Sequence, residues 1–273
     1  MTNAKKCHCN ILLKWYNVIK IGSGMMKSIK KVMSLVLIVC TIFFMTGCGK
    51  NENELVLATE AGFAPYEYYE DGKVVGVDID IAKEIAKELG KELVIKDVSF
   101  DFVINEVKSG KADFAAAGIS ITPEREKEVD FTIEYTTSNQ VVVVKKGSPI
   151  TKFDDIKDKK IAVQLGSVAD LYVEENYKKA TIVPHKKYLS AVEDVKTNKA
   201  DCIIMDELPA REIVKENDNL VILDGFLFQD KYGMIVKKGN DELKDKINKV
   251  LERMKNDGTI DKLVLEHSKL RFL

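Results

Sequence analysis

Apolar positions from residue 55 onward form short runs that alternate with helical patterns. Spacings of three and four, as at Ile81, Ile85 and Leu89, predict amphipathic helices, and Asp78 stands where it could cap the first of them. Strand and helix in alternation predict an α/β fold of parallel-type sheets with helices on both faces. The pattern predicts strands at 55–59, 92–97, 113–117, 160–164, 181–184, 201–205 and 233–237, and helices at 78–90, 101–109, 168–177, 190–197, 241–256 and 259–269.

A short segment occurs twice. Val-Lys-Ser-Gly-Lys-Ala-Asp at 107–113 matches Val-Lys-Thr-Asn-Lys-Ala-Asp at 195–201, an offset of 88 residues, and each copy ends a predicted helix and opens a predicted strand. A repeat of this length indicates two similar lobes rather than a solenoid. We expect residues 55–136 and 232–273 to form lobe 1, residues 141–228 to form lobe 2, and residues 137–140 and 229–231 to form a two-strand hinge.

The region before residue 55 has a different character. From Met26 a basic stretch precedes an uncharged run at 32–49, which is typical of a secretory signal and short for a membrane span of about 20 residues. We expect residues 1–47 to be a leader. Signal peptides rarely have some 25 residues ahead of the basic stretch, so residues 1–24 suggest a misassigned start, with the true one at Met25 or Met26.

The end of the apolar run, Met45-Thr46-Gly47-Cys48, resembles the lipobox of bacterial lipoproteins, with Met45 in place of the usual Leu. The resemblance implies export and a lipidated Cys48 that anchors the protein to the outer face of the bacterial cell membrane. Residues 48–54 would then be a polar tether. The alternative is a plain membrane anchor with an incidental cysteine.

Charge is unevenly placed along the chain. The 42 basic and 43 acidic residues give a net charge of −1, but residues 1–47 hold seven Lys and no acid, so the remainder has 35 basic and 43 acidic residues, a net −8. An acidic body argues against nucleic-acid binding. The body has one cysteine, Cys202, and two histidines, His185 and His267, so we expect no disulfide framework, metal site or cofactor there.

Candidate ligand residues follow the predicted strands. In open α/β sheets, ligands bind beyond the carboxyl ends of the strands, so residues directly after them should face one cleft. These positions supply aromatic rings, one arginine, acids and a Gly-Ser turn: Glu60, Phe63, Tyr66, Phe100, Gly118, Ser120, Arg125, Gly166, Ser167, Val168 and Asp206.

Two of these features suit a carboxylate. The chain has 38 Lys and 4 Arg, so Arg125 is notable, and its planar fork can hold a carboxylate by two parallel hydrogen bonds. Ser167 would open a helix whose first N–H groups favour an anion. The alternative for Arg125 is an ordinary surface arginine among charged neighbours.

Other features suit the rest of an amino acid. Asp206 could accept from an ammonium group, and Phe63 and Phe100 could enclose an apolar stem. The alternatives are a helix cap for Asp206 and ordinary core packing for the two rings. Taken together, the set predicts a site for a free α-amino acid.

Several segments together resemble the extracellular solute-binding proteins, family 3, of polar amino acid ABC transporters. The resemblance implies a two-lobe, type II periplasmic-binding-protein-like fold that is a monomer and not an enzyme. It further implies delivery of a captured polar amino acid to membrane permease subunits. The matching segments are 58–67 (Ala-Thr-Glu-Ala-Gly-Phe-Ala-Pro-Tyr-Glu), 76–82 (Gly-Val-Asp-Ile-Asp-Ile-Ala), 109–113, 118–125 (Gly-Ile-Ser-Ile-Thr-Pro-Glu-Arg), 129–131, 164–167 (Gln-Leu-Gly-Ser) and 199–201.

The resemblance also implies a role for each site residue. Gly118, Ser120 and Asp206 would meet the ligand ammonium, and the Arg125 side chain and the Val168 backbone would meet its carboxylate. Many relatives have a second hydroxyl residue where this chain has Val168. The rings of Phe63 and Phe100 would stack on the ligand, and Tyr66, Gln164 and Ser167 complete the ligand-binding set.

Two features bear on the ligand's side chain. Glu60 lies where relatives that bind cationic side chains often have an acid, the alternative being an acid at the pocket's rim. Ala116 and Ala117 would leave room for a long side chain. Arg, Lys, His and cystine are the candidates, with a preference for a basic one. A different use of the same fold is a cyclohexadienyl (prephenate or arogenate) dehydratase, with Glu60 and Asp206 as acid and base.

Overall fold

The computed structural model describes residues 51–268, and from Glu52 onward they belong to one compact unit. Residues 1–47, Cys48 and the next two residues of the tether therefore lie outside the described chain. Within it, no helix is long and apolar enough to cross a membrane.

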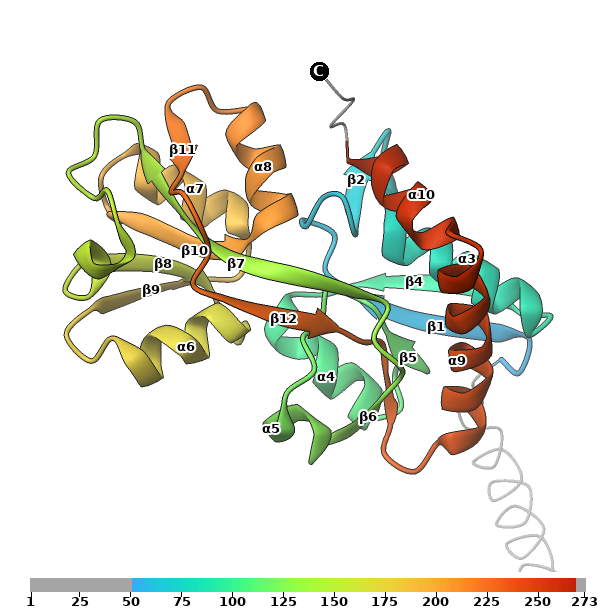
Figure 1. Cartoon of the computed structure of the whole chain (residues 1–273). Helices are drawn as coiled ribbons and strands as arrows, with labels where there is room; N and C mark the ends of the chain where they lie inside the picture. Colours follow the sequence, from blue (N-terminus) through green and yellow to red (C-terminus); the bar gives the residue numbers. More distant parts are fainter. Residues whose placement is uncertain (1–50, 269–273) are drawn as a thin grey trace, which may run out of the picture. The chain divides into compact units, whose positions relative to one another are not determined.

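Two mixed sheets define two lobes (Figure 1). Lobe 1 has the strand order β4-β1-β5-β13-β6, and lobe 2 has the order β11-β7-β10-β8-β9, with β12 paired to β7. The strands are β1 (Glu54–Thr59), β2 (Tyr68–Glu70), β3 (Lys73–Val75), β4 (Glu92–Asp97), β5 (Phe114–Ala115), β6 (Val129–Phe131), β7 (Thr136–Lys145), β8 (Lys160–Gln164), β9 (Thr181–His185), β10 (Cys202–Asp206), β11 (Leu220–Ile222), β12 (Phe228–Tyr232) and β13 (Ile235–Lys237).

Helices cover both faces of each sheet. In lobe 1, α3, α9 and α10 pack on one another over one face and α4 lies on the other, as Figure 1 shows. Side chains of β1 point alternately to the two faces of the sheet. Leu55 and Leu57 pack in the core under α3, α9 and α10, and Ala58 packs in the core under α4. The helices are α3 (Val77–Glu88), α4 (Phe100–Lys108), α5 (Pro123–Glu126), the 3-10 turn η1 (Phe153–Ile156), α6 (Val168–Asn176), α7 (Tyr188–Lys196), α8 (Glu207–Lys215), α9 (Asp241–Asn256) and α10 (Thr259–His267).

The predicted α/β alternation is confirmed, with a refinement in strand direction. β1 pairs in parallel with β4 and β5, and β8 pairs in parallel with β9 and β10, as expected where a helix connects two strands. β13 and β7 are antiparallel to their neighbours because the chain enters these sheets from the other lobe.

Two strands connect the lobes. β7 and β12 pair antiparallel from Thr136 opposite Tyr232 to Gln140 opposite Phe228, and in Figure 1 they run side by side between the sheets. The predicted crossing at 136–140 is therefore the first half of a continuous strand whose second half, 141–145, joins the lobe 2 sheet. The ranges predicted as the hinge fall within this paired ribbon.

Asp78 does not cap α3 as predicted. Gly76 is the N-cap, with φ of 132°, and an added Cβ would lie 2.1 Å from the carbonyl oxygen of Tyr66, so only glycine fits. Asp78 is instead fully buried inside the first turn, where it accepts hydrogen bonds from the backbone N–H of Gly118 at 3.1 Å and the hydroxyl of Tyr135. The side chain links α3 to the end of β5.

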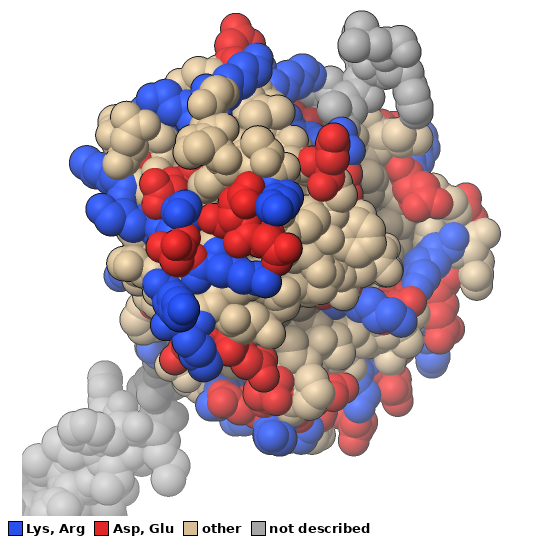
Figure 2. Space-filling view, turned by 60° about the vertical axis from the view of Figure 1, so that its left-hand side comes forward, with Lys and Arg blue, Asp and Glu red and all other residues tan. Residues whose placement is uncertain are grey.

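The surface mixes charges of both signs. Figure 2 shows acidic and basic side chains interspersed over one face, and many are paired along helices, as Lys83 is with Asp80 and Lys196 with Glu193. Such exposed pairs contribute little to stability.

Candidate ligand-binding site

A small cavity lies between the lobes. Its walls come from the carboxyl ends of strands in both sheets, as the strand-end argument predicts. Of the predicted site residues, all but Tyr66, Arg125 and Gly166 line it, and the carbonyl oxygen of Gly166 accepts from Arg125. The lining residues are Glu60, Phe63, Glu67, Phe100, Ala117, Gly118, Ser120, Gln164, Ser167, Val168, Tyr188 and Asp206.

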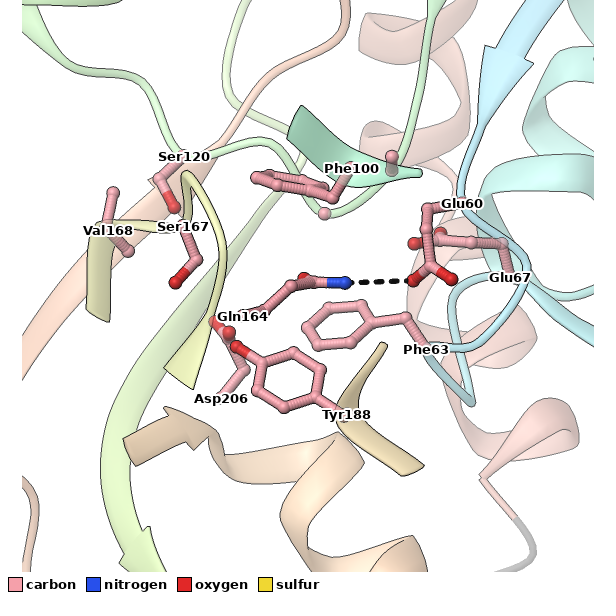
Figure 3. A pocket seen from close by; sticks show the side chains of 12 residues that line it. Glu60, Phe63, Glu67, Phe100, Ser120, Gln164, Ser167, Val168, Tyr188 and Asp206 are labelled. Atoms are coloured by element: carbon pink, nitrogen blue, oxygen red, sulfur yellow. Dashed lines mark hydrogen bonds between the residues drawn. The ribbon is translucent and has the colours of Figure 1, made fainter. Parts of the chain in front are cut away.

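Three aromatic rings form the sides of the cavity. In Figure 3 Phe100 lies on one side, and Phe63 and Tyr188 lie on the other. The rings of Phe63 and Tyr188 stack across the two lobes with centroids 5.7 Å apart and planes at 22°. Phe63 belongs to the core and lines the cavity at once, so the core interpretation is correct and its contact with a ligand stays a prediction.

One end of the cavity can receive an anion. Ser120 of lobe 1 faces Ser167 and Val168 of lobe 2 there (Figure 3). The Ser167 hydroxyl caps α6 by accepting from the N–H of Asp170 at 3.2 Å, and the first N–H groups of a helix have no acceptor within it. Gly166 has φ of 77°, a conformation that glycine adopts without strain and that starts the helix at this point.

Arg125 is buried behind this end, which excludes the surface interpretation. Its side chain is 7% exposed, donates to the carbonyl oxygen of Ser120 at 2.8 Å and to that of Gly166 at 3.1 Å, and lies over the Phe100 ring. Burial lowers the pKa of Arg125 to about 10, so the guanidinium stays charged at neutral pH. Because Gly166 belongs to lobe 2, Arg125 joins the two lobes at the anion end.

Asp206 ends β10 and is the N-cap residue of α8, but its carboxylate makes no capping hydrogen bond and accepts from other side chains instead. It accepts from Gln140 Nε2 at 2.7 Å and from the hydroxyl of Tyr232. Burial raises its pKa. On β12, one of the two connecting strands, Asp230 accepts from the Ser120 hydroxyl, and burial together with the charge of Asp206 raises the pKa of Asp230 to about 7.

The opposite end of the cavity is acidic. Glu60 is 1% exposed, which excludes the rim interpretation, and its Oε2 accepts from Gln164 Nε2 of lobe 2 at 3.1 Å (Figure 3). Glu67 lies beside it, fully buried, and neither carboxylate oxygen has a hydrogen-bond partner within residues 51–268. Burial raises the pKa of Glu60, and burial with the nearby charge of Asp78 raises that of Glu67 well above its usual range.

The residues of this chain match the family model of the bacterial extracellular solute-binding proteins, family 3, over residues 55–268. The chain belongs to this family. The match begins with β1 and ends after α10, so it covers both lobes and every residue that lines the cavity of this solute-binding protein.

Individual relatives resemble this solute-binding protein along most of their length. It is 32% identical over 251 residues to the arginine-binding extracellular protein ArtP of Bacillus subtilis, covering 86% of this chain and 96% of the relative. Among solved structures, the amino acid ABC transporter substrate-binding protein AbpA of Streptococcus pneumoniae, bound to L-arginine, matches with a TM-score of 0.76 and 36% identity, over 79% of this chain and 94% of that one. An ancestral amino acid-binding protein, AncCDT-1, described as a precursor of cyclohexadienyl dehydratase, matches with a TM-score of 0.74 and 35% identity, over 80% and 96%.

Sequence reasoning placed two residues differently and missed three. Tyr66 packs beneath Phe63 in the core and does not line the cavity, and Arg125 lies behind it. The missed residues are Glu67 and Tyr188, which line the cavity, and Asp230 on β12. Tyr188 could have been found from the repeat, because it follows Phe100 by the same 88 residues.

Proposed function

We propose that this protein captures a free L-amino acid with a basic side chain between its lobes and delivers it to the permease of an ABC importer. The observation that carries the proposal is the buried carboxylate of Glu60 at the end of the cavity away from Ser120, Ser167 and Val168. A ligand that placed its carboxylate near Ser167 and its ammonium near Asp206 would extend its side chain toward Glu60. A cationic end there removes the cost of a buried, incompletely paired charge.

Closure of the lobes over the ligand is part of the proposal. The contacts from Arg125 to Gly166 and from Gln164 to Glu60 join opposite lobes at the two ends of the cavity. They can form together only when the lobes are close, so the closed shape reports an occupied site to the permease. We further propose that the protein is exported and held at the outer face of the membrane by a lipidated Cys48.

A thermal-shift screen against the twenty amino acids, ornithine and cystine tests the proposal. A ligand at about 100 times its dissociation constant adds about 2.7 kcal/mol of stability, so we expect arginine, lysine or ornithine to give the largest shift. In Glu60→Gln, the affinity for the basic ligand should fall about tenfold or more while that for a neutral amino acid changes little, because one charge-assisted bond is lost. Equal losses of affinity for the basic and the neutral amino acid would contradict the role of Glu60. If cystine gave the largest thermal shift, the assigned ligand would be cystine and not a basic amino acid.

The second candidate is dehydratase activity, favoured by the similarity to the ancestral precursor of that enzyme. Glu60 and Asp206 are the cavity carboxylates that could serve as acid and base. Incubating the purified protein with prephenate and with arogenate decides between the two functions, because turnover of either compound would replace the transport assignment.

A further inference from the structure

The link between β9 and α7 brings two lysines of lobe 2 against lobe 1. Lys187 Nζ lies 3.5 Å from Glu60 Oε1, with 45% of the lysine side chain exposed. Lys186 Nζ lies 5.9 Å from the ring centroid of Phe102, at the start of α4. These contacts cross the cleft at the acidic end of the cavity.

Lys187 stands at a helix position that local preferences disfavour. It is the N-cap of α7, and the equivalent residue of α4, 88 positions earlier, is Ser99. Serine is among the preferred N-cap residues, whereas a cation at a helix N-terminus opposes the helix dipole. Departures from local preference are expected where a residue serves a site. The pairing with Glu60 provides such a reason.

The geometry around Glu60 leaves one oxygen for a cation. Gln164 occupies Oε2, while Oε1 makes no hydrogen bond within the described part of the chain. Backbone closes the other side, since a Cβ added at Gly62 would lie 2.8 Å from Oε1. The ammonium of Lys187 and the cationic end of a ligand would therefore compete for Oε1.

We propose that Lys187 is a specificity-determining residue that sets how strongly the site prefers cationic over neutral side chains. When the end of the ligand is neutral, Lys187 remains paired with Glu60 and balances its charge. When the end is cationic, Lys187 withdraws into solvent, which its flexible stem and half-exposed position allow. The inference rests on the proposed function and adds a residue that limits its selectivity.

Calorimetric titration with L-arginine and L-citrulline tests the inference, because the two ligands have the same length and differ in charge at the end. In Lys187→Gln, arginine no longer displaces a cation, and citrulline leaves Glu60 unbalanced. The ratio of the citrulline to the arginine dissociation constant should rise about fivefold, because that ratio corresponds to the free energy that a partly exposed ion pair contributes. Lys187→Arg should keep the wild-type ratio, and so should the matched control Lys186→Gln, which changes the neighbouring lysine.

A double-variant cycle links the effect to Glu60. In a Glu60→Gln background, Lys187→Gln should leave the ratio unchanged, because no carboxylate remains to be balanced. An unchanged ratio in Lys187→Gln with Glu60 intact overturns the inference and leaves the proposed function standing. If the wild-type protein binds neither ligand, the basic preference falls as well, and the inference with it.

Discussion

The two lobes repeat one helix-turn-strand unit whose backbone hydrogen bonds are nearly identical. After α4, the N–H groups of residues 111 and 112 donate to the carbonyl of Glu106 at 2.9 and 3.0 Å; after α7, those of residues 199 and 200 donate to Asp194 at 2.8 and 3.1 Å. In each unit the aspartate that follows the turn accepts from a backbone N–H of a strand in the same lobe, β1 in lobe 1 and β8 in lobe 2. The repeated sequence therefore encodes the turn and its anchoring.

The same comparison shows where the units diverge. At equivalent positions lobe 1 has Ser99, Phe100 and Gly118 where lobe 2 has Lys187, Tyr188 and Asp206. Phe100, Gly118, Tyr188 and Asp206 line the cavity and Lys187 pairs with Glu60, whereas the matched residues lie in the turns. Identity between the units is thus found in the turns, and these differences are found at the cavity where we propose that a ligand binds.

The largest effect should be on stability, where truncating Tyr188 at the start of α7 should cost more than truncating Phe100 at the start of α4. Tyr188 is 1% exposed and stacks on Phe63, so Tyr188→Ala should lower the free energy of unfolding by about 3–5 kcal/mol. Phe100 is only partly buried, and Phe100→Ala should cost less than half as much. Urea denaturation measures both, with Tyr188→Phe as the control. Equal losses would show that the rings support the core alike.

Strand and helix positions were largely predictable because each lobe buries regular apolar patterns. Residues 160–164 and 241–256 form a strand and a helix at the predicted bounds. The hairpin β2–β3 and the short α5, β6 and β11 were missed because three or four residues carry no readable period. α8 was also missed, because Pro209 in its first turn resembles a helix break.

Most of the residues that line the cavity were predictable from the strand ends and the family resemblance. How deeply each side chain is buried, and which lobe it contacts, was not predictable. Sequence order cannot show that Arg125 reaches Gly166 across the cleft or that Tyr66 lies beneath Phe63, because both depend on how the lobes close. Glu67 was hidden for a related reason, since it is fully buried by tertiary packing, close to Asp78 of α3, which its place ahead of β2 does not reveal.

The next difference concerns the equivalent strand ends Gly118 and Asp206. Gly118 has φ of 54°, and an added Cβ would lie 2.7 Å from Cε1 of Phe63, so Gly118→Ala should push this ring into the cavity and weaken ligand binding about 100-fold. Asp206→Asn keeps the shape and removes one charge, so about tenfold is expected. Calorimetry with the ligand found in the screen compares the variants. If Gly118→Ala bound the ligand with wild-type affinity, the strand end at Gly118 would not be part of the binding site.

The smallest effects should come from the anchoring aspartates, where the lobes are alike. Asp113 accepts from the N–H of Val56, and Asp201 from that of Lys160, each at 2.8 Å. Asp113→Ala and Asp201→Ala should each lower the unfolding free energy by about 1 kcal/mol, because water reaches both groups and replaces part of the bond. The double variant should lose the sum of the two, since the sites lie in different lobes. Thermal or urea unfolding of all three variants measures this, and a loss confined to one lobe would show that the repeated segment anchors only one of its two strands.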